Sequence, residues 1–270
     1  MPAPSERTNK TADRTLHLLR LVAESGVTRF ADLEARTGLP KATLHELLGS
    51  LLGGHWVTRD DASGRFEVGP ACFEVGAAFA GLMSTRRVVG AVLDDLVARF
   101  DETCNLGLLQ GADILYLDRR VTGQPMAYAP PVGRRLPAHS TALGKILLAE
   151  LGSAELDARL PSPLPKVTRH TITSRRRLAT ELSAARAHGF AADSQESTLG
   201  VGCIAVRVPH DRLPLALSMA APVLRLGPDA LSARVPELRS AARDIGLRLA
   251  ATEWATGTTV AEGIAAAPNA

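Results

Sequence analysis

Small polar side chains precede the expected start of a helix in residues 136–145. His139, Ser140 and Thr141 come directly before an apolar run that we expect to be helical over 141–151. The first N–H groups of a helix lack intrahelical acceptors, and the positive end of the helix dipole favours an anion. The segment therefore predicts a site for a carboxylate. Ordinary helix capping by Ser140 or Thr141 is the alternative, because it would give the same sequence.

A nucleophilic triad is the second chemistry that the residue types allow. Cys203, His139 and Asp193 could serve as thiol, base and orienting carboxylate if the fold gathered them. Nothing in the sequence marks an activated thiolate, and a lone cysteine in an apolar run is usually a small buried hydrophobe. The sequence therefore gives this triad little support.

Metal and phosphate-loop chemistry are not indicated. The seven histidines never stand three or four residues apart, and the three cysteines contain no CxxC pair. Gly144-Lys145 does not complete a phosphate loop, since His139 and Ile146 occupy positions that require Gly and Ser or Thr. We expect no metal and no cofactor.

A second polar set shares one side of a helix predicted at 41–53. Four leucines at i, i+3, i+4 and i+7 mark its buried side, namely Leu44, Leu47, Leu48 and Leu51. In the preceding tetrapeptide, Gly38 can end a helix in the left-handed conformation and Pro40 suits the first turn of the next. The side chains left to contact a ligand are those of Lys41, Ala42, Thr43, His45, Glu46 and Ser50.

The elements around this helix predict a winged helix-turn-helix, a module that places one helix in a DNA groove. A support helix is expected at 11–23 and a positioning helix at 30–37. Strands at 56–59 and 65–68 flank a loop rich in turn formers, which would form the wing. Arg59 and Arg65 lie beside the wing tip, where each could contact DNA or pair with a nearby carboxylate.

Charge and composition limit the possible partners and location. The whole chain carries a net charge of +3, but the part up to Met83 has nine basic and ten acidic side chains, a net charge of −1. Because phosphate neutralisation supplies most non-specific affinity, one copy should bind DNA weakly. The polar N-terminus is unlike a signal peptide, and no window reaches the roughly 18 apolar residues of a membrane span. We expect a cytoplasmic protein without membrane contact.

The remainder predicts an α+β architecture with a second, ligand-binding domain. We expect a disordered arm at 1–10, the winged helix-turn-helix at 11–70, a linker helix at 71–84, the effector domain at 85–253 and a disordered tail at 254–270. In the effector domain, strands are expected at 105–108, 114–118, 125–129, 190–193, 203–208 and 215–220, with helices at 141–151, 175–188 and 228–251.

Four stretches resemble the IclR-type bacterial transcriptional regulators in order and spacing. They are Thr37-Gly38-Leu39-Pro40-Lys41-Ala42-Thr43, the run from Pro131-Val132-Gly133 to Gly144-Lys145, Gly189-Phe190-Ala191-Ala192-Asp193, and Gly200-Val201-Gly202-Cys203-Ile204-Ala205. The resemblance covers about Arg14 to Leu249. It implies a winged helix-turn-helix, a linker helix and a GAF-like mixed α/β effector domain, in a dimer or tetramer that represses or activates operons for small-molecule metabolism.

The resemblance also implies an effector pocket with a defined set of lining residues. They are Tyr128, Ala138, His139, Ser140, Thr141, Gly144, Asp193, Val201, Cys203, Ser218 and Ala220. Some positions depart from the family. Ala42 and Glu46 stand where Ser and Arg are frequent, and Gln195 and Ala220 also differ, so operator and ligand preferences do not transfer.

Taken together, these features predict a ligand-responsive transcriptional regulator. Its partners would be double-stranded operator DNA, a small carboxylate or aromatic effector, and further copies of itself. Two alternatives stay open. One is an enzyme that acts on a small molecule through Cys203 and His139 with an appended helix-turn-helix, and the other is a winged-helix module that contacts protein rather than DNA.

Overall fold

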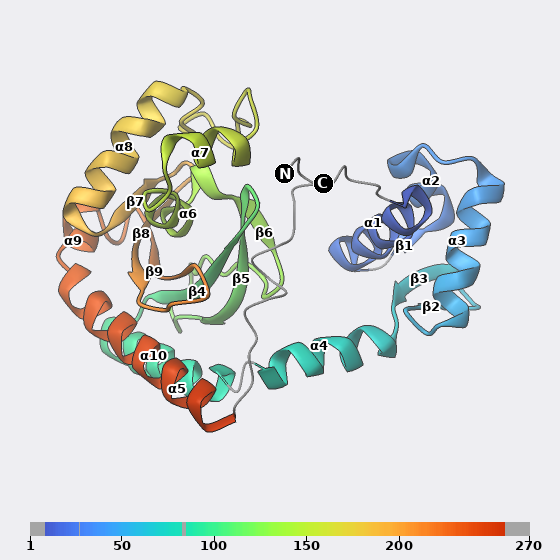
Figure 1. Ribbon diagram of the computed structural model, residues 1–270, viewed down its shortest axis with the longest axis horizontal. Helices are drawn as coiled ribbons and strands as arrows, with labels where there is room; N and C mark the ends of the chain where they lie inside the picture. The colour runs from blue at the N-terminus through green and yellow to red at the C-terminus, as the bar shows by residue number, and fades with distance from the viewer. Residues whose placement is uncertain (1–8, 27, 83–84, 257–270) are drawn as a thin grey trace, which may run out of the picture. The chain divides into compact units, whose positions relative to one another are not determined.

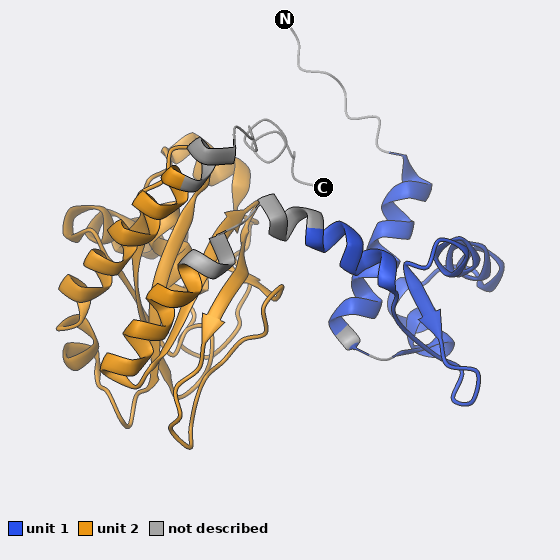
Figure 2. Ribbon diagram, turned by 90° about the horizontal axis from the view of Figure 1, so that it is seen from below, with its two compact units in different colours: residues 1–81 blue, residues 82–270 orange. Residues whose placement is uncertain are grey.

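The computed structural model describes residues 9–26, 28–82 and 85–256 of the 270-residue chain. The chain divides into two compact units, Met1–Gly81 and Leu82–Ala270 (Figure 2). Most of the arm and tail expected at 1–10 and 254–270 lies outside the described residues. Each unit has its own hydrophobic core, and each is described by itself below.

The first unit is a winged helix-turn-helix followed by a further helix (Figure 1). Its helices match the predicted ones closely, and a two-residue strand that the sequence did not predict completes a three-stranded antiparallel sheet of order β1-β3-β2. The elements are α1 (Lys10–Ser25), β1 (Thr28–Arg29), α2 (Phe30–Thr37), α3 (Lys41–Gly53), β2 (Val57–Arg59), β3 (Arg65–Val68) and α4 (Pro70–Leu82).

Local chemistry explains where these helices begin and end. The Asn9 side chain caps α1 by accepting hydrogen bonds from the N–H groups of Thr11 and Ala12. Gly38 ends α2 in the left-handed conformation at φ 64°, and its N–H donates to the Glu34 carbonyl at 2.9 Å. The short turn that follows sets the direction of α3.

The second unit is built on a six-stranded antiparallel sheet of order β6-β5-β4-β9-β8-β7. Helices α5 and α10 cover one face, and η1, α6 and α8 lie on the other (Figure 1). The elements are α5 (Thr85–Phe100), β4 (Thr103–Gln110), β5 (Asp113–Arg120), β6 (Arg135–Pro137), η1 (Ala138–Ser140), α6 (Ala142–Leu148), α7 (Ser153–Arg159), α8 (Arg175–His188), β7 (Ala191–Ser194), β8 (Val201–Val208), β9 (Leu215–Pro222), α9 (Pro228–Ser232) and α10 (Val235–Thr256).

Two expectations for this unit were wrong. The strand expected at 125–129 is irregular chain, in which Pro125 and the following Pro130-Pro131 pair remove the N–H groups that a ladder needs. The sheet edge is instead formed by β6. The helix expected at 228–251 is two helices, because Pro236 has no N–H to donate back to Ser232 and so cannot continue α9.

Helix α6 lies unusually close to the chain that precedes it. A Cβ atom on Gly144 would lie 2.1 Å from the Ala138 carbonyl oxygen, and one on Gly107 would lie 2.8 Å from Ile114. Only hydrogen fits at either position without movement of the surroundings. These two glycines therefore allow α6 to pack directly on η1 and the sheet.

We predict that Gly144→Ala destabilises the second unit by about 3 kcal/mol, because the added methyl group would force backbone apart in a packed interior. Gly152→Ser is the matched control, since Gly152 caps α7 with φ −72° and its Cβ would meet nothing within 4 Å. Thermal unfolding of both variants is the measurement. Equal melting temperatures would contradict the close packing of α6.

Candidate DNA-reading face and effector site

The outward side of α3 carries the residues that the sequence singled out. Its four leucines are buried, with exposed fractions of 0–6%. Lys41, Ala42, His45, Glu46 and Ser50 are exposed, and Thr43 is half-buried. The amphipathic division predicted for this helix is therefore present, and we refer to these six residues as the α3 face.

Neighbouring residues restrain part of the α3 face. The His45 ring stacks on Phe30 with centroids 4.3 Å apart, a contact that the sequence did not reveal. Lys41 stays largely in solvent, with its ammonium 4.0 Å from a Glu34 carboxylate oxygen. A surface pair of this kind contributes little and is easily exchanged for another anion. Lys41 is therefore available for DNA, whereas His45 is already partly held.

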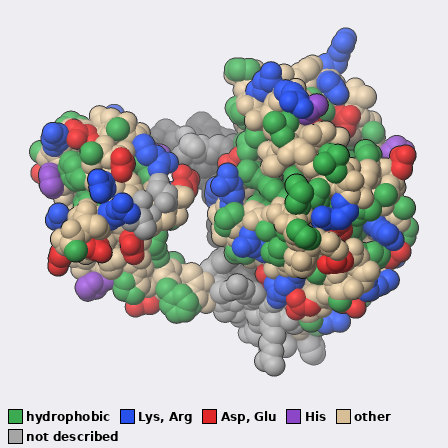
Figure 3. All heavy atoms as spheres, turned by 180° about the vertical axis from the view of Figure 1, so that it is seen from behind, with side chains coloured by type: hydrophobic (Ala, Val, Ile, Leu, Met, Phe, Trp, Pro, Cys, Tyr) green, Lys and Arg blue, Asp and Glu red, His purple; other side chains and the backbone are tan. Residues whose placement is uncertain are grey.

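The wing is held by one carboxylate at its tip. The Asp60 side chain accepts hydrogen bonds from the N–H groups of Ala62 and Ser63, both at 2.8 Å, and these bonds lower the pKa of Asp60. Arg59 lies over the Phe66 ring at 5.8 Å, and Arg65 lowers the Asp60 pKa further through its charge. On the face of this unit drawn in Figure 3, basic and acidic side chains are interspersed, in keeping with its near-neutral charge.

In the second unit, strand register places many of the predicted effector-pocket residues on the face of the sheet that α6 covers. We refer to the eleven predicted lining residues as the effector-site set. Asp193 pairs with Cys203, and Cys203 pairs with Ala220. Two residues further along, Ala205 pairs with Ser218. Directly opposed residues of a pleated sheet share a face. Val201 belongs to the same alternating series on β8, so it also lies on this face.

Both tyrosines of the chain belong to this neighbourhood, although the sequence pointed only to Tyr128. Burial raises the pKa of Tyr116 well above 10, and the nearby Asp193 charge raises it further, whereas Arg134 opposes the change. The Tyr128 pKa is raised by the same causes. Both phenols therefore stay protonated and can donate hydrogen bonds. Tyr116 lies two residues after Ile114 and so on the same buried face of β5, which is the signal that would have placed it.

Asp193 is engaged by the chain that follows β7. One carboxylate oxygen accepts the Glu196 N–H at 2.6 Å, and the other accepts the Ser197 hydroxyl at 2.5 Å. Glu196 in turn meets the buried Lys145 ammonium at 2.5 Å, and that ammonium also donates to the Ala192 carbonyl at 3.1 Å. Lys145 thus connects α6 to the segment that holds Asp193.

The start of α6 shows ordinary helix capping, which was the alternative to an anion site. The Thr141 hydroxyl accepts the Gly144 N–H at 3.0 Å, and the Ser140 hydroxyl donates to the Pro137 carbonyl at 2.9 Å. These are ordinary capping contacts, so the free N–H groups that the anion prediction required are partly occupied. Ala138, His139, Ser140, Thr141 and Gly144 are all buried, and the side chains of His139, Ser140 and Thr141 make hydrogen bonds to nearby backbone.

The groups proposed for a nucleophilic triad are each engaged elsewhere. The His139 ring nitrogen Nε2 lies 2.9 Å from the Pro165 carbonyl, and Asp193 is bound by Glu196 and Ser197. Burial and the Asp193 charge raise the pKa of the Cys203 thiol, which disfavours a thiolate. The geometry therefore does not favour the enzyme alternative. Within the described residues, no three His, Cys, Asp or Glu side chains could together hold a metal ion.

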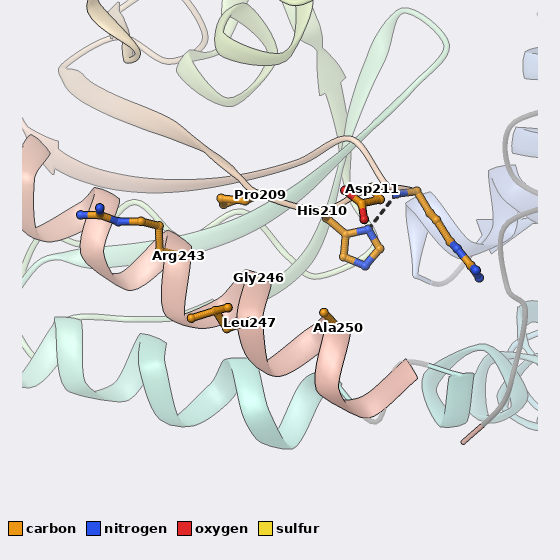
Figure 4. Close-up of a pocket in the computed structure, with 8 residues that line it drawn as sticks. Pro209, His210, Asp211, Arg243, Gly246, Leu247 and Ala250 are labelled. Carbon is orange, nitrogen blue, oxygen red and sulfur yellow. Dashed lines mark hydrogen bonds between the residues drawn. The ribbon is translucent and has the colours of Figure 1, made fainter. Parts of the chain in front are cut away.

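A separate hollow of about 540 Å³ lies between the β8–β9 turn and α10 (Figure 4). It forms where the Pro209 carbonyl approaches Gly246, at which a Cβ atom would lie 2.3 Å from that oxygen. None of its lining residues belongs to the effector-site set. They are Pro209, His210, Asp211, Arg212, Arg243, Gly246, Leu247 and Ala250.

The fold, the α3 face and the candidate effector site define a class of protein. It is a winged-helix DNA-binding regulator with an effector-binding α+β domain. Family comparison agrees, since the IclR helix-turn-helix domain matches residues 11–61 and the bacterial transcriptional regulator IclR C-terminal domain matches residues 79–247. The chain belongs to the IclR family of bacterial transcriptional regulators. The predicted resemblance, the fold class and the regulatory function are thereby confirmed.

Named relatives and solved structures support the same assignment. The chain is 34% identical to the regulator XynR of Escherichia coli over 78% of its own length and 85% of that protein. It is 28% identical to the E. coli repressor IclR, covering 91% and 92% of the two chains. A Microbacterium hydrocarbonoxydans IclR homolog crystallised with 4-hydroxybenzoate has the same fold, with a TM-score of 0.77, 24% identity, and coverage of 90% of this chain and 100% of that one.

We predict that Asp193 makes stability depend on pH. Burial raises its pKa from 3.8 to about 6, despite the opposing hydrogen bonds from Ser197 and Glu196. An acid with a raised folded-state pKa stabilises the fold below its unfolded pKa, and that contribution is lost as the pH rises through the folded value. An asparagine does not titrate, so Asp193→Asn does not lose this stability as the pH rises. Its stability relative to the wild type should therefore rise by up to about 3 kcal/mol between about pH 4 and pH 7.5.

Thermal unfolding over this pH range tests the prediction. Asp157→Asn is the control, because it removes the same charge from an exposed position on α7, where the side chain is 80% exposed. The Asp193→Asn difference should grow with pH while the Asp157→Asn difference stays level. Two parallel curves would show that the Asp193 carboxyl is not perturbed in the folded protein.

Proposed function

We propose that α3 enters the major groove of an operator and that the α3 face contacts it. Base edges and phosphates would meet Lys41, Ala42, Thr43, His45, Glu46 and Ser50, and the wing residues Arg59 and Arg65 would approach the backbone. The observation that supports this most directly is the division of α3 into four buried leucines and an open polar side. Glu46 repels phosphate but can accept a hydrogen bond from a cytosine amino group.

We propose that the protein acts as a homo-oligomer, a dimer or a tetramer. The near-neutral first unit offers little affinity for one copy, and two recognition helices about 34 Å apart could read successive turns of one DNA face. Helix α4 supports self-association, because Phe73 and Val75 are apolar yet 78% and 57% exposed. We take residues 11–70 as the DNA-binding domain, 71–84 as the linker and 85–253 as the effector domain.

We propose that the effector is a small carboxylic acid, with or without an aromatic ring, that binds on the α6-covered face of the sheet. Two protonated phenols and the Arg134 charge lie near one another there, and these groups suit an anionic oxygen. The 4-hydroxybenzoate bound by the Microbacterium homolog is an acid of this kind. The proposed lining is Tyr128, Ala138, His139, Ser140, Thr141, Gly144, Asp193, Val201, Cys203, Ser218 and Ala220, together with Tyr116.

We infer that this site binds its ligand without converting it. The Cys203 thiol has a raised pKa, and Asp193 and His139 are engaged elsewhere. A regulator that reads DNA works in the compartment that holds the DNA, and we propose a cytoplasmic location. None of the described helices combines the length and apolarity that a bilayer span requires.

We predict that Lys41→Ala and Thr43→Ala each weaken operator binding by about 1–3 kcal/mol, because each removes a contact to bases or phosphates. If Lys41 contacts a phosphate, its loss should also reduce the salt slope by about one. Fluorescence anisotropy on genomic fragments enriched by the full-length protein measures both effects.

Lys166→Ala is the matched control for this experiment, since it removes an exposed lysine from the second unit. It should leave DNA affinity unchanged. If all three variants bind equally well, the α3 face is not the DNA contact, and a winged-helix module that binds protein becomes the better account.

A further inference from the structure

Two polar side chains lie at the middle of the six-stranded sheet, on its central strands. Asn105 on β4 is directly opposite Ser218 on β9, and their exposed fractions are 1% and 0%. The flanking residues Cys104 and Leu106 pack into the core beneath α5 and α10. Because side chains alternate along a strand, Asn105 points to the other face, the one that carries the proposed effector site.

The hydrogen-bonding capacity of the Asn105 amide is only partly used. Its nitrogen donates to the Ser218 hydroxyl at 3.4 Å, a long bond. Its oxygen is buried and has no hydrogen-bond partner among the described residues. Exchanging the oxygen and nitrogen would leave the same deficit at the other end of the amide. A buried polar group left in this state is uncommon, and a bound ligand is one explanation for it.

The residues around this pair are small. On the same face, Thr103 and Gly107 flank Asn105 along β4, Ala216 and Ala220 flank Ser218 along β9, and Ala205 is opposite Ser218 on β8. Thr103 is the other buried polar residue of this group, and its hydroxyl accepts the Thr122 N–H at 3.4 Å. The remaining neighbours are apolar, so the Asn105 amide and the Ser218 hydroxyl are the polar groups at the centre of this part of the sheet. Tyr116 lies opposite Gly107, and Cys203 lies two residues from Ala205, so the pair adjoins the groups already assigned to the effector.

We propose that Asn105 and Ser218 form a subsite for a hydroxyl group and that the effector is therefore a small hydroxy acid. This proposal rests on the proposed effector site and names the chemistry that the site selects. A hydroxyl group both donates and accepts, so it satisfies the free end of the amide in either orientation. A hydrocarbon group would leave that end unpaired, and sites built to hydrogen-bond a hydroxyl discriminate strongly against analogues that lack it.

Stability of the free protein gives the first test. Asn105→Leu replaces an incompletely bonded amide by an apolar group of similar size, so the melting temperature of the full-length protein should not fall. Thr171→Val is the contrast, because the buried Thr171 hydroxyl donates to the Glu196 carbonyl at 2.7 Å and accepts the Thr168 N–H at 2.7 Å. Its loss should lower the melting temperature by about 3 °C or more. An equal fall for Asn105→Leu would show that the amide is structural and would overturn the proposal.

Ligand preference gives the second test. Calorimetry with the full-length protein would compare 4-hydroxybenzoate with benzoate, lactate with propionate, and 3-hydroxybutyrate with butyrate. At least one hydroxy acid should bind ten or more times more tightly than its partner. In Asn105→Leu that preference should fall to about one, while affinity for the acid without the hydroxyl changes less than threefold. Asn105→Ala repeats the comparison if the leucine variant does not fold.

The outcomes distinguish a failure of the hydroxyl subsite from a failure of the proposed carboxylate effector site. If acids bind the wild type without any preference for a hydroxyl group, the hydroxyl subsite is overturned, and the Asn105 amide contacts only water. The proposed effector site would remain. Preference that survives in the Asn105 variants would also overturn it. If no acid in the set binds, the carboxylate effector itself is wrong, and the subsite fails with it.

Discussion

The arrangement of the effector domain depends on one buried ammonium group. Lys145 is 1% exposed, and its Nζ atom lies 2.5 Å from Glu196, 3.1 Å from the Ala192 carbonyl and 3.7 Å from Glu181. An uncompensated buried charge is strongly destabilising, so these partners must remain in place while α6 stays packed on the sheet. Glu196 donates its own N–H to Asp193, and Lys145 therefore positions that carboxylate indirectly.

This ion pair need not add stability in order to matter. Removing two charges from water costs much of what their attraction returns, and burial raises the pKa of Glu196 even though Lys145 opposes the change. What the pair supplies is a fixed relation between α6, the chain after β7 and the sheet. A ligand that contacts Asp193 and the tyrosines would bias elements already tied together. An effector changes the conformation only through its differential affinity for two states. Because these elements are connected, a ligand that favours one position of Asp193 also favours the matching position of α6.

The DNA-reading part follows a simpler rule. Four leucines bury one side of α3. The six polar or small residues of the α3 face lie on the side that can contact a ligand. This division is local, because a 3.6-residue period alone determines it. Because the same unit is near-neutral, bulk electrostatic attraction offers it little affinity for DNA.

The sequence predicted elements with long periodic patterns and strong end signals. The bounds of α2, α3 and α8 agree with expectation, since each has an apolar stripe and a clear start or stop. It did not predict β1, β6 and α7, which are too short to show a period, and it placed a strand at 125–129 where prolines prevent one. Tertiary partners decide such short elements.

The candidate site was predicted only in part, for a related reason. The resemblance to the family pointed to Asp193, Cys203 and Ser218, whereas Tyr116, Asn105 and the role of Lys145 depend on cross-strand register and long-range contacts. Asn105 and Ser218 are 113 positions apart in the chain. Without a structure, nothing in the local pattern around either residue indicates that they face each other.

A ligand-responsive regulator requires that occupancy of the second unit change how the first unit binds DNA. The most direct test measures the dissociation constant of the full-length protein for an enriched operator fragment, without acid and with a saturating amount of an acid that binds in calorimetry. We expect the two dissociation constants to differ by roughly 5- to 150-fold, equivalent to about 1–3 kcal/mol of coupling. Equal dissociation constants in the two conditions would contradict this expectation.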